Sequence, residues 1–130
     1  MINKKDKAII GKIADVAAEP VGRSQGASIR ILLGAERGMP HFHTRLFTLA
    51  PGGRIPEHLH PEIEHEQVVI GGELTISLDG ELRTVGVGHF VYIPAGCAHW
   101  YENRGAEETR FLCMIPAGIA YTTEWKEPAP

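Results

Sequence analysis

Short runs of alternating or apolar residues, separated by glycine and proline, make up most of the sequence. The runs lie at residues 28–33, 41–50, 65–70, 73–78, 81–85, 89–95 and 108–115. In ELTISL at 73–78, apolar and polar residues alternate with the period of a strand that has one buried face. Many runs of this length with turn signals between them predict an all-β sandwich or barrel.

Turn residues mark the ends of the predicted strands. The chain contains 15 glycines and 9 prolines among its 130 residues, and many of them fall between the runs. Asp79-Gly80, between residues 73–78 and 81–85, predicts a two-residue hairpin turn. A helix is expected only near the N-terminus, at about residues 6–18. The final residues, 122–130, are expected to form a loose tail.

Composition and charge argue against several functional classes. The length of 130 residues predicts a single domain. The net charge is −3 and no basic run is longer than Lys4-Lys5, so nothing favours nucleic acid or an anionic membrane as a partner. No apolar stretch is long enough for a membrane helix or a signal peptide, which favours a cytoplasmic protein. Cys97 and Cys113 are too few for a disulfide framework.

The stretch HLHPEIEHE, residues 58–66, is the first candidate for chemistry. His58 and His60 are two residues apart, and on a strand this spacing points both side chains to the same face. They would then supply two adjacent imidazole ligands for a transition metal. By itself the pair is weak evidence, because two unrelated strand or surface histidines give the same pattern.

Two longer patterns of residue spacing place His58 and His60 in a wider context. The chain contains Gly52-x5-His58-x-His60-x4-His65-x6-Gly72 and, about 15 residues later, Gly88-x5-Pro94-x-Gly96-x2-His99-x3-Asn103. Together they resemble the two motifs of the cupin family. The resemblance implies a single jelly-roll barrel in which His99, from the second motif, joins the ligands of the first. It covers residues 26–118, which leaves an N-terminal arm at 1–25 and a C-terminal tail at 119–130.

The third ligand is either Glu64 or its neighbour His65, because both registers satisfy the family spacing to a following glycine. If Glu64 points inward, Glu66 does too, and a second buried carboxylate is costly unless it is paired. If His65 points inward, it is accompanied by the neutral amide of Gln67, which would lie beside the metal and the substrate. Strand parity therefore favours His65 and leaves Glu64 outside.

A closer resemblance points the same way. The strings RLFTLAPGG, HLHPEIEHE, GGELTI and FLCMIP are similar to those of small manganese cupins with an all-histidine site, such as one from Thermotoga. The resemblance implies one divalent metal per chain, bound by His58, His60, His65 and His99, with Mn or Fe favoured and Ni, Cu or Zn as alternatives. It also implies that Phe111 and Cys113 line the pocket. The string between His60 and His65 is one residue longer here.

Four neutral imidazoles would leave a divalent ion its full charge, which favours anionic ligands. The leading hypothesis is an oxygenase-type oxidoreductase, such as a dioxygenase, acting on a small organic molecule. The alternatives are a non-redox enzyme, such as a sugar-acid isomerase, lyase or decarboxylase, and a non-catalytic metal- or ligand-binding module. An inward Arg45 would favour the non-redox enzyme, but a solvated salt bridge is expected for it. Residues 28–33 are expected to form an edge strand, which predicts a homodimer.

Overall fold

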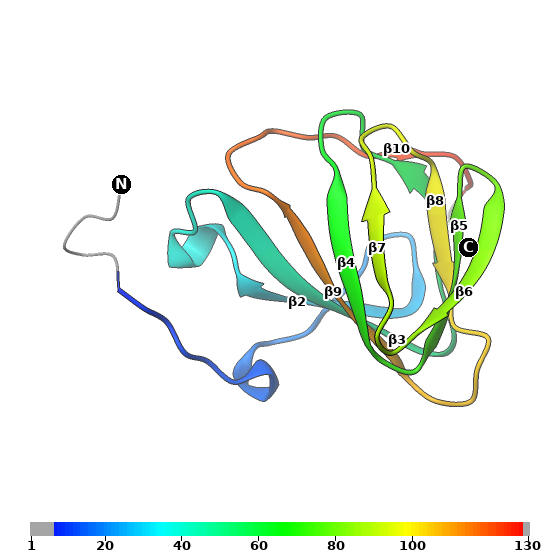
Figure 1. Ribbon diagram of the computed structural model, residues 1–130, viewed down its shortest axis with the longest axis horizontal. Coiled ribbons are helices and arrows are strands. Elements are labelled where there is room, and N and C mark those ends of the chain that lie inside the picture. The colour runs from blue at the N-terminus through cyan, green and yellow to red at the C-terminus, as the bar shows by residue number, and fades with distance from the viewer. Residues whose placement is uncertain (1–6, 129–130) are drawn as a thin grey trace.

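The computed structural model describes residues 7–128 and shows a barrel built almost entirely from strands (Figure 1). Two 3-10 turns, η1 (Ile13–Asp15) and η2 (Ala35–Arg37), are its only helical elements within those residues. Its strands are β1 (Glu19–Pro20), β2 (Gln25–Leu33), β3 (Phe42–Leu59), β4 (His65–Gly71), β5 (Glu73–Leu78), β6 (Glu81–Gly86), β7 (Phe90–Ile93), β8 (His99–Glu102), β9 (Thr109–Pro116) and β10 (Glu124–Trp125). Each predicted run overlaps one of these strands, so the all-β barrel is confirmed.

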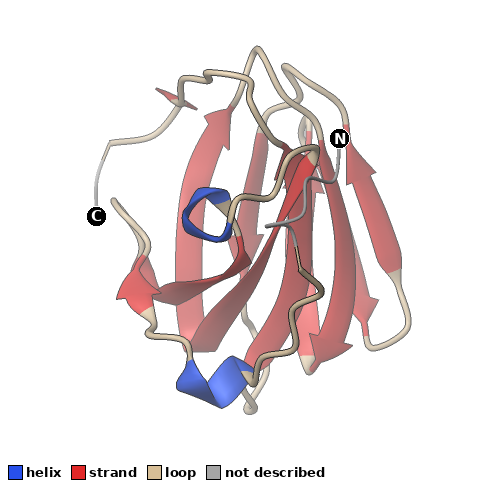
Figure 2. Cartoon of the chain, turned by 90° about the vertical axis from the view of Figure 1, so that its left-hand side faces the viewer, coloured by secondary structure: helices blue, strands red, loops and turns tan. Residues whose placement is uncertain are grey.

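The strands form one antiparallel sheet that curls into two layers, and β3 belongs to both. The order is β6-β5-β8-β3-β9-β4-β7, and β2 and β10 also pair with β3. Residues 42–49 of β3 pair with β9, whereas residues 54–58 pair with β8. Figure 2, turned by 90°, shows the strands curving around a common interior, with both helical turns outside it.

Pro51-Gly52-Gly53 marks the point at which β3 passes from one layer to the other. A Cβ atom on Gly53 would lie 2.6 Å from the carbonyl oxygen of Gly26, so the close approach of these two backbones requires glycine. The turn directs the second half of β3, which carries His58, toward β8. The residues Pro51-Gly52-Gly53, which predict a turn between two strands, therefore form a bend within one long strand.

The predicted hairpin at Asp79-Gly80 is confirmed. Asp79 and Gly80 have φ angles of 49° and 86°, and a type I′ turn requires positive φ at both central residues. The turn closes the pairing of Leu78 with Glu81, and the remaining residues of β5 and β6 pair in register.

An apolar core fills the space between the two layers. It includes Leu49, Ile55, Ile63, Val69, Leu74, Ile76, Ile93 and Phe111, each at most 2% exposed. Asn103, from the second motif, is buried beside them. Its Nδ2 donates to Leu49 O at 3.0 Å and to Glu107 O at 2.7 Å, and its Oδ1 accepts from Gly105 N at 3.0 Å. Asn103 therefore braces a turn, as expected from its residue type.

The N-terminal segment is extended rather than helical. Within residues 7–18 only η1 is helical, none of its residues is buried, and Lys12 provides no side-chain cap. A helical turn that is neither capped nor packed has nothing to offset the cost of nucleation. The expected helix at residues 6–18 is therefore wrong over residues 7–18, and residue 6 lies outside the described residues. No helix within residues 7–128 is long and apolar enough to cross a membrane.

Candidate metal centre

Three of the predicted histidines meet where β3 pairs with β8. His58 lies directly opposite His99 in the register of these strands, and their ring centroids are 4.3 Å apart. One nitrogen from each of His58, His60 and His99 lies within 4.8 Å of the other two. Two nitrogens that are each about 2.1 Å from one ion are at most about 4.2 Å apart. Small side-chain adjustments would therefore let all three bind the same ion.

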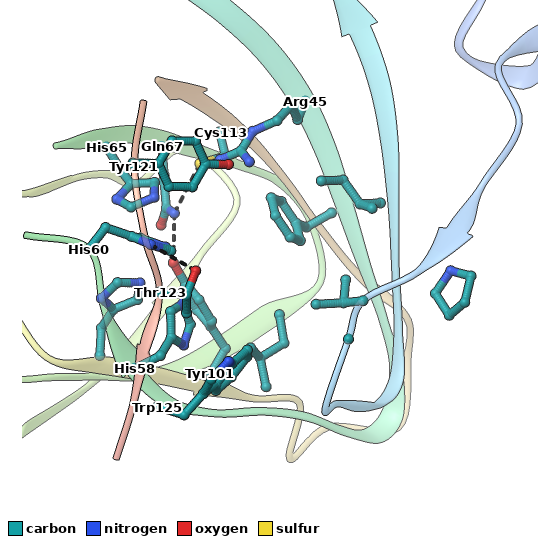
Figure 3. Close-up of a pocket in the computed structure, with 17 residues that line it drawn as sticks. Arg45, His58, His60, His65, Gln67, Tyr101, Cys113, Tyr121, Thr123 and Trp125 are labelled. Carbon is teal, nitrogen blue, oxygen red and sulfur yellow. Dashed lines mark hydrogen bonds between the residues drawn. The ribbon is translucent and has the colours of Figure 1, made fainter. Parts of the chain in front are cut away.

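The fourth histidine, His65, approaches from another strand. It begins β4, is 4% exposed, and its ring centroid lies 5.1 Å from that of His60 and 5.4 Å from that of His99. It does not belong to the group of nitrogens within 4.8 Å of one another. Figure 3 shows His58, His60 and His65 facing the same space. The four rings thus converge, and three of them form the tighter cluster.

Backbone carbonyls orient three of the rings. The bonds are His58 Nδ1 to Pro56 O (2.8 Å), His99 Nδ1 to Cys97 O (2.9 Å) and His60 Nδ1 to Thr122 O (3.1 Å). Because a carbonyl oxygen only accepts, each Nδ1 carries the proton and each neutral ring keeps its lone pair on Nε2. The same arrangement fixes the rings of histidine ligands in metal sites.

The Nδ1 atom of His65 provides a test of whether these residues fit a metal. It is buried and has no hydrogen-bond partner among the described residues. A buried polar atom without a partner costs about 1–3 kcal/mol, so such atoms are uncommon in folded proteins. A cation bound at this nitrogen would orient the ring and offset that cost. The donor set therefore fits a divalent transition metal, for which imidazole is a preferred ligand.

Burial keeps the four imidazoles neutral at physiological pH. Desolvation lowers the pKa of His58 to about 4, of His99 to about 3 and of His65 to about 2. The pKa of His60 is also lowered, again mainly by desolvation. Because a histidine must lose its proton before it binds a metal, these shifts favour binding over a wide pH range.

The structure places Glu64 outside this cluster. Glu64 and Glu66 are exposed, whereas His65 and Gln67 are 4% and 3% exposed. The carboxylate of Glu64 accepts a hydrogen bond from the hydroxyl of Tyr92 at 3.3 Å. Strand parity at β4 is therefore as predicted, and the inward position belongs to a histidine.

The histidines lie in a cavity of about 240 Å³. Its polar wall contains Gln67, Tyr101, Cys113 and Arg45. The Gln67 Nε2 atom donates to Tyr101 Oη at 2.7 Å and to Cys113 Sγ at 3.4 Å, and Arg45 Nη2 donates to Cys113 Sγ at 3.1 Å. Gln67 and Cys113 thus line the pocket as predicted.

Two of the predictions about the pocket need correction. Phe111 does not line the cavity but lies behind it, 1% exposed, with its ring stacked on those of Phe47 and Tyr101. Arg45 points inward rather than into a solvated salt bridge, because residue 45 pairs with Cys113 of β9. Sequence parity could have found Arg45, since it is two residues from Phe47, which also lines the cavity.

The C-terminal residues 119–127, here called the strap, close one side of the cavity. Tyr121, Thr123 and Trp125 line it, and their spacing of two residues was a signal that sequence reasoning missed. The ring of Trp125 lies 4.9 Å from that of His58. The strap also supplies the carbonyl of Thr122 that orients His60.

Ionic and backbone contacts hold the strap in place. Strand β10 pairs with β3, and Lys126 N donates to Glu57 O at 2.8 Å. Both guanidinium Nη atoms of Arg54 donate to the carboxylate of Glu127, at 2.8 Å and 3.0 Å, and this contact lowers the pKa of Glu127. The expected loose tail is therefore wrong up to residue 128, and residues 129–130 lie outside the described part.

Comparison with known families decides what this barrel is. Residues 45–115, more than half of the chain, match the family model of the cupin domain. The chain belongs to the cupin family. The matched range begins at Arg45 and extends past His99, so it contains all four histidines, and the resemblance inferred from the two motifs is confirmed.

Several characterised proteins are similar to this cupin in sequence. It is 33% identical to the polyketide synthase CurC of Streptomyces cyaneus over 106 residues, which are 78% of this chain and 66% of that protein. It is 36% identical to the oxalate oxidase GF-3.8 of Triticum aestivum over 74 residues, 51% of this chain and 33% of that protein. The chain thus spans less than two thirds of both relatives.

Two solved structures show the same fold. The polyketide cyclase RemF from Streptomyces resistomycificus matches with a TM-score of 0.85 and 26% identity, covering 94% of this chain and 87% of its own. A predicted oxalate decarboxylase from Thermotoga maritima matches with a TM-score of 0.74 and 19% identity, covering 83% of this chain and 98% of its own. At that lower identity the second likeness concerns the fold alone.

Proposed function

We propose that this cupin is a metal-dependent enzyme that acts on a small, enolisable 1,3-dicarbonyl compound, with His58, His60, His65 and His99 as the metal ligands. One observation carries the proposal: among the described residues, the cavity is lined by imidazoles, neutral polar and apolar groups and one arginine, but by no carboxylate. An ion bound by neutral imidazoles keeps its double positive charge and attracts oxygen anions. The enolate of a 1,3-dicarbonyl compound offers two oxygens that share one negative charge.

The likeness to CurC and RemF supports this substrate class. Both names refer to polyketides, whose chains carry carbonyl groups on alternate carbon atoms. The cavity of about 240 Å³ is below the range of about 300–1,000 Å³ that is usual for drug-sized ligands. We therefore favour a compact substrate, or one end of a longer chain.

A metal bound here would supply Lewis-acid activation of the substrate carbonyls. Tyr101 would act as a hydrogen-bond donor beside it. Burial raises the pKa of Tyr101, so its phenol stays protonated at neutral pH. Because Gln67 donates to the phenol oxygen at 2.7 Å, the hydroxyl hydrogen is directed elsewhere, where it can donate to a substrate oxygen that gains negative charge. The strap and Phe47 would exclude water from the same space.

Oxygen-dependent oxidation of the same kind of substrate is the second candidate. The match to a wheat oxalate oxidase over half of this chain favours it. It requires a redox-active metal such as Mn or Fe, whereas ring closure or another non-redox reaction also proceeds with Zn or Ni. For either reaction we expect the enzyme to work in the cytoplasm on a free small molecule.

The test combines metal analysis with product analysis. Protein purified without a histidine tag is loaded with one metal at a time and incubated with 3,5-dioxohexanoate, with and without oxygen. We expect a metal-dependent product at the same oxidation level as the substrate, which forms equally with and without oxygen. Oxygen uptake with oxidised products, whether or not the carbon chain is cleaved, would select the second candidate. Binding without any turnover would contradict both and indicate a non-catalytic module.

Matched histidine variants show whether turnover arises at the proposed centre. His58→Ala should lose both metal and turnover. His89→Ala changes an exposed histidine outside the cavity and should keep both. Turnover that survives His58→Ala would mean that the reaction does not use this centre.

A further inference from the structure

The cavity contains one charged side chain that the cupin motifs do not explain. Arg45 lies in the first half of β3 and reaches into the cavity beside Cys113 (Figure 3). Its Nη2 donates to Cys113 Sγ at 3.1 Å, and its guanidinium carbon lies 5.3 Å from the centre of the Phe47 ring. Its Nε is buried and has no hydrogen-bond partner among the described residues.

These contacts leave the charge of Arg45 poorly compensated. A guanidinium group is always protonated and has five N–H donors, whereas a thiol is a weak acceptor. The ion pairs within residues 7–128 involve Arg54, Arg83, Arg104 and Lys126, but not Arg45. A partly buried charge without an anion is costly, so this position favours a ligand that brings one.

The shape of the missing partner follows from the donors. The planar guanidinium presents parallel N–H groups that match the two oxygens of a carboxylate. Figure 3 shows Arg45 on the same side of the cavity as Cys113 and Gln67, and His58 on the opposite side. A molecule that meets both sides would carry an anionic group at one end and metal-binding oxygens at the other.

We propose that Arg45 binds a carboxylate of the substrate, so that the substrate is a dicarbonyl acid rather than a neutral dicarbonyl compound. The second half of this statement rests on the proposed function, whereas the carboxylate site at Arg45 stands on its own contacts. Arg45 is then a specificity-determining residue, and Tyr101 and Gln67 lie alongside the bound chain.

The test uses 3,5-dioxohexanoate and its methyl ester, which share the dicarbonyl group and differ in the charge of one end. Calorimetric titration of the metal-loaded protein should show that the acid binds about 10- to 100-fold more tightly than the ester. Equal affinity of the wild-type protein for acid and ester would overturn the proposal without any variant.

Variants then assign the preference to one side chain. Arg45→Gln should bind acid and ester with similar affinity, and Arg45→Lys should retain part of the preference. Arg83→Gln removes an exposed arginine on β6 and should behave as wild type. If a folded Arg45→Gln protein still preferred the acid, Arg45 would not be the residue that binds the carboxylate. Unchanged affinity for the ester in this variant would show that the metal centre is intact.

The same titration on metal-free protein separates the two proposals. Suppose that the metal-free protein prefers the acid through Arg45, and that the protein binds no metal when metal is added. That result would refute the proposed function but would support the carboxylate site at Arg45. Metal-dependent turnover of acid and ester at equal rates and with equal affinities would support the proposed function and refute the carboxylate site at Arg45.

Discussion

At the scale of single residues, the site depends on which of two neighbours points inward. Glu64 and His65 are adjacent, so the pleat places them on opposite sides of the chain. The inward side chain is His65, whose Nδ1 has no partner among the described residues. The outward side chain is Glu64, which bonds to Tyr92 instead. An inward glutamate would reduce the charge of a bound metal by one unit, so this parity sets the electrostatics of the centre.

Exchanging the two neighbours in turn tests the ligand set. His65→Ala should lower metal affinity at least tenfold, because one of the four proposed ligands is lost, whereas Glu64→Ala should keep the metal content of the wild type. Mass-spectrometric metal analysis after dialysis measures both. Metal that is lost in Glu64→Ala and kept in His65→Ala would show that the third ligand is the glutamate.

At the scale of elements, β3 and the strap build the site together. The bend of β3 at Gly53 directs His58 toward β8. The strap then returns from the end of the chain to pair with the same strand and to orient His60 through Thr122 O. Three strands and the strap therefore contribute to the candidate centre, and a change in the strap would affect a metal bound there through the ring of His60.

Releasing the end of the strap tests this arrangement. Glu127→Ala removes the bidentate contact with Arg54, and both partners are 32% exposed, so global stability should fall by less than about 1 kcal/mol. The amide hydrogen of Lys126, bonded to Glu57 O, should nevertheless exchange several-fold faster. Glu81→Ala breaks the exposed pair with Arg83 and should leave that rate unchanged. An unchanged Lys126 rate in Glu127→Ala would show that β10 holds the strap without the ion pair.

At the scale of the whole molecule, three buried imidazoles and the half-buried ring of His60 link folding to pH. In the unfolded chain each has a pKa of about 6.5, whereas burial lowers those of His58, His99 and His65 to about 4, 3 and 2. Between about pH 6.5 and pH 4 the unfolded chain therefore binds protons that the folded chain does not. The free energy of unfolding must fall as the pH decreases through this range.

Metal-free protein should show this loss directly. Each histidine contributes up to about 1.4 kcal/mol per pH unit below about pH 6.5, and urea unfolding at several pH values measures the sum. The stability of His65→Ala should decrease less steeply with falling pH. A flat profile for the wild-type apoprotein between about pH 7 and pH 5 would mean that the rings take up protons without unfolding.

We also predict that the molecule is a homodimer that pairs through β2. Residues 19–21 occupy this strand from Ala27 to Ile29, but Ile31 is 44% exposed, so the outer edge of β2 beyond Ile29 is available. Light scattering should give about twice the chain mass of 14.2 kDa. Ile31→Lys should produce a monomer, whereas Phe90→Lys, on the distant strand β7, should not. A wild-type monomer would refute the prediction.

The sequence by itself determined the strands, one hairpin and the core of the site. Alternation and turn residues depend on contacts between near neighbours, so β2, β5 and the Asp79-Gly80 turn could be predicted. The spacing of His58, His60 and His99 indicated a shared site, and parity selected His65 over Glu64. These features are local, or are repeated in a family pattern.

Only the tertiary structure decided which distant groups join them. Arg45 is inward because β3 pairs with β9 at Cys113, and Phe111 is behind the cavity because Phe47 and Tyr101 cover it. The strap is ordered because β10 and Glu127 find partners on β3, more than 60 residues earlier in the chain. Within residues 7–18 the chain is not helical beyond η1, because η1 buries none of its residues and has no side-chain cap. Each outcome depends on contacts between segments far apart in sequence, and local patterns carry no information about such contacts.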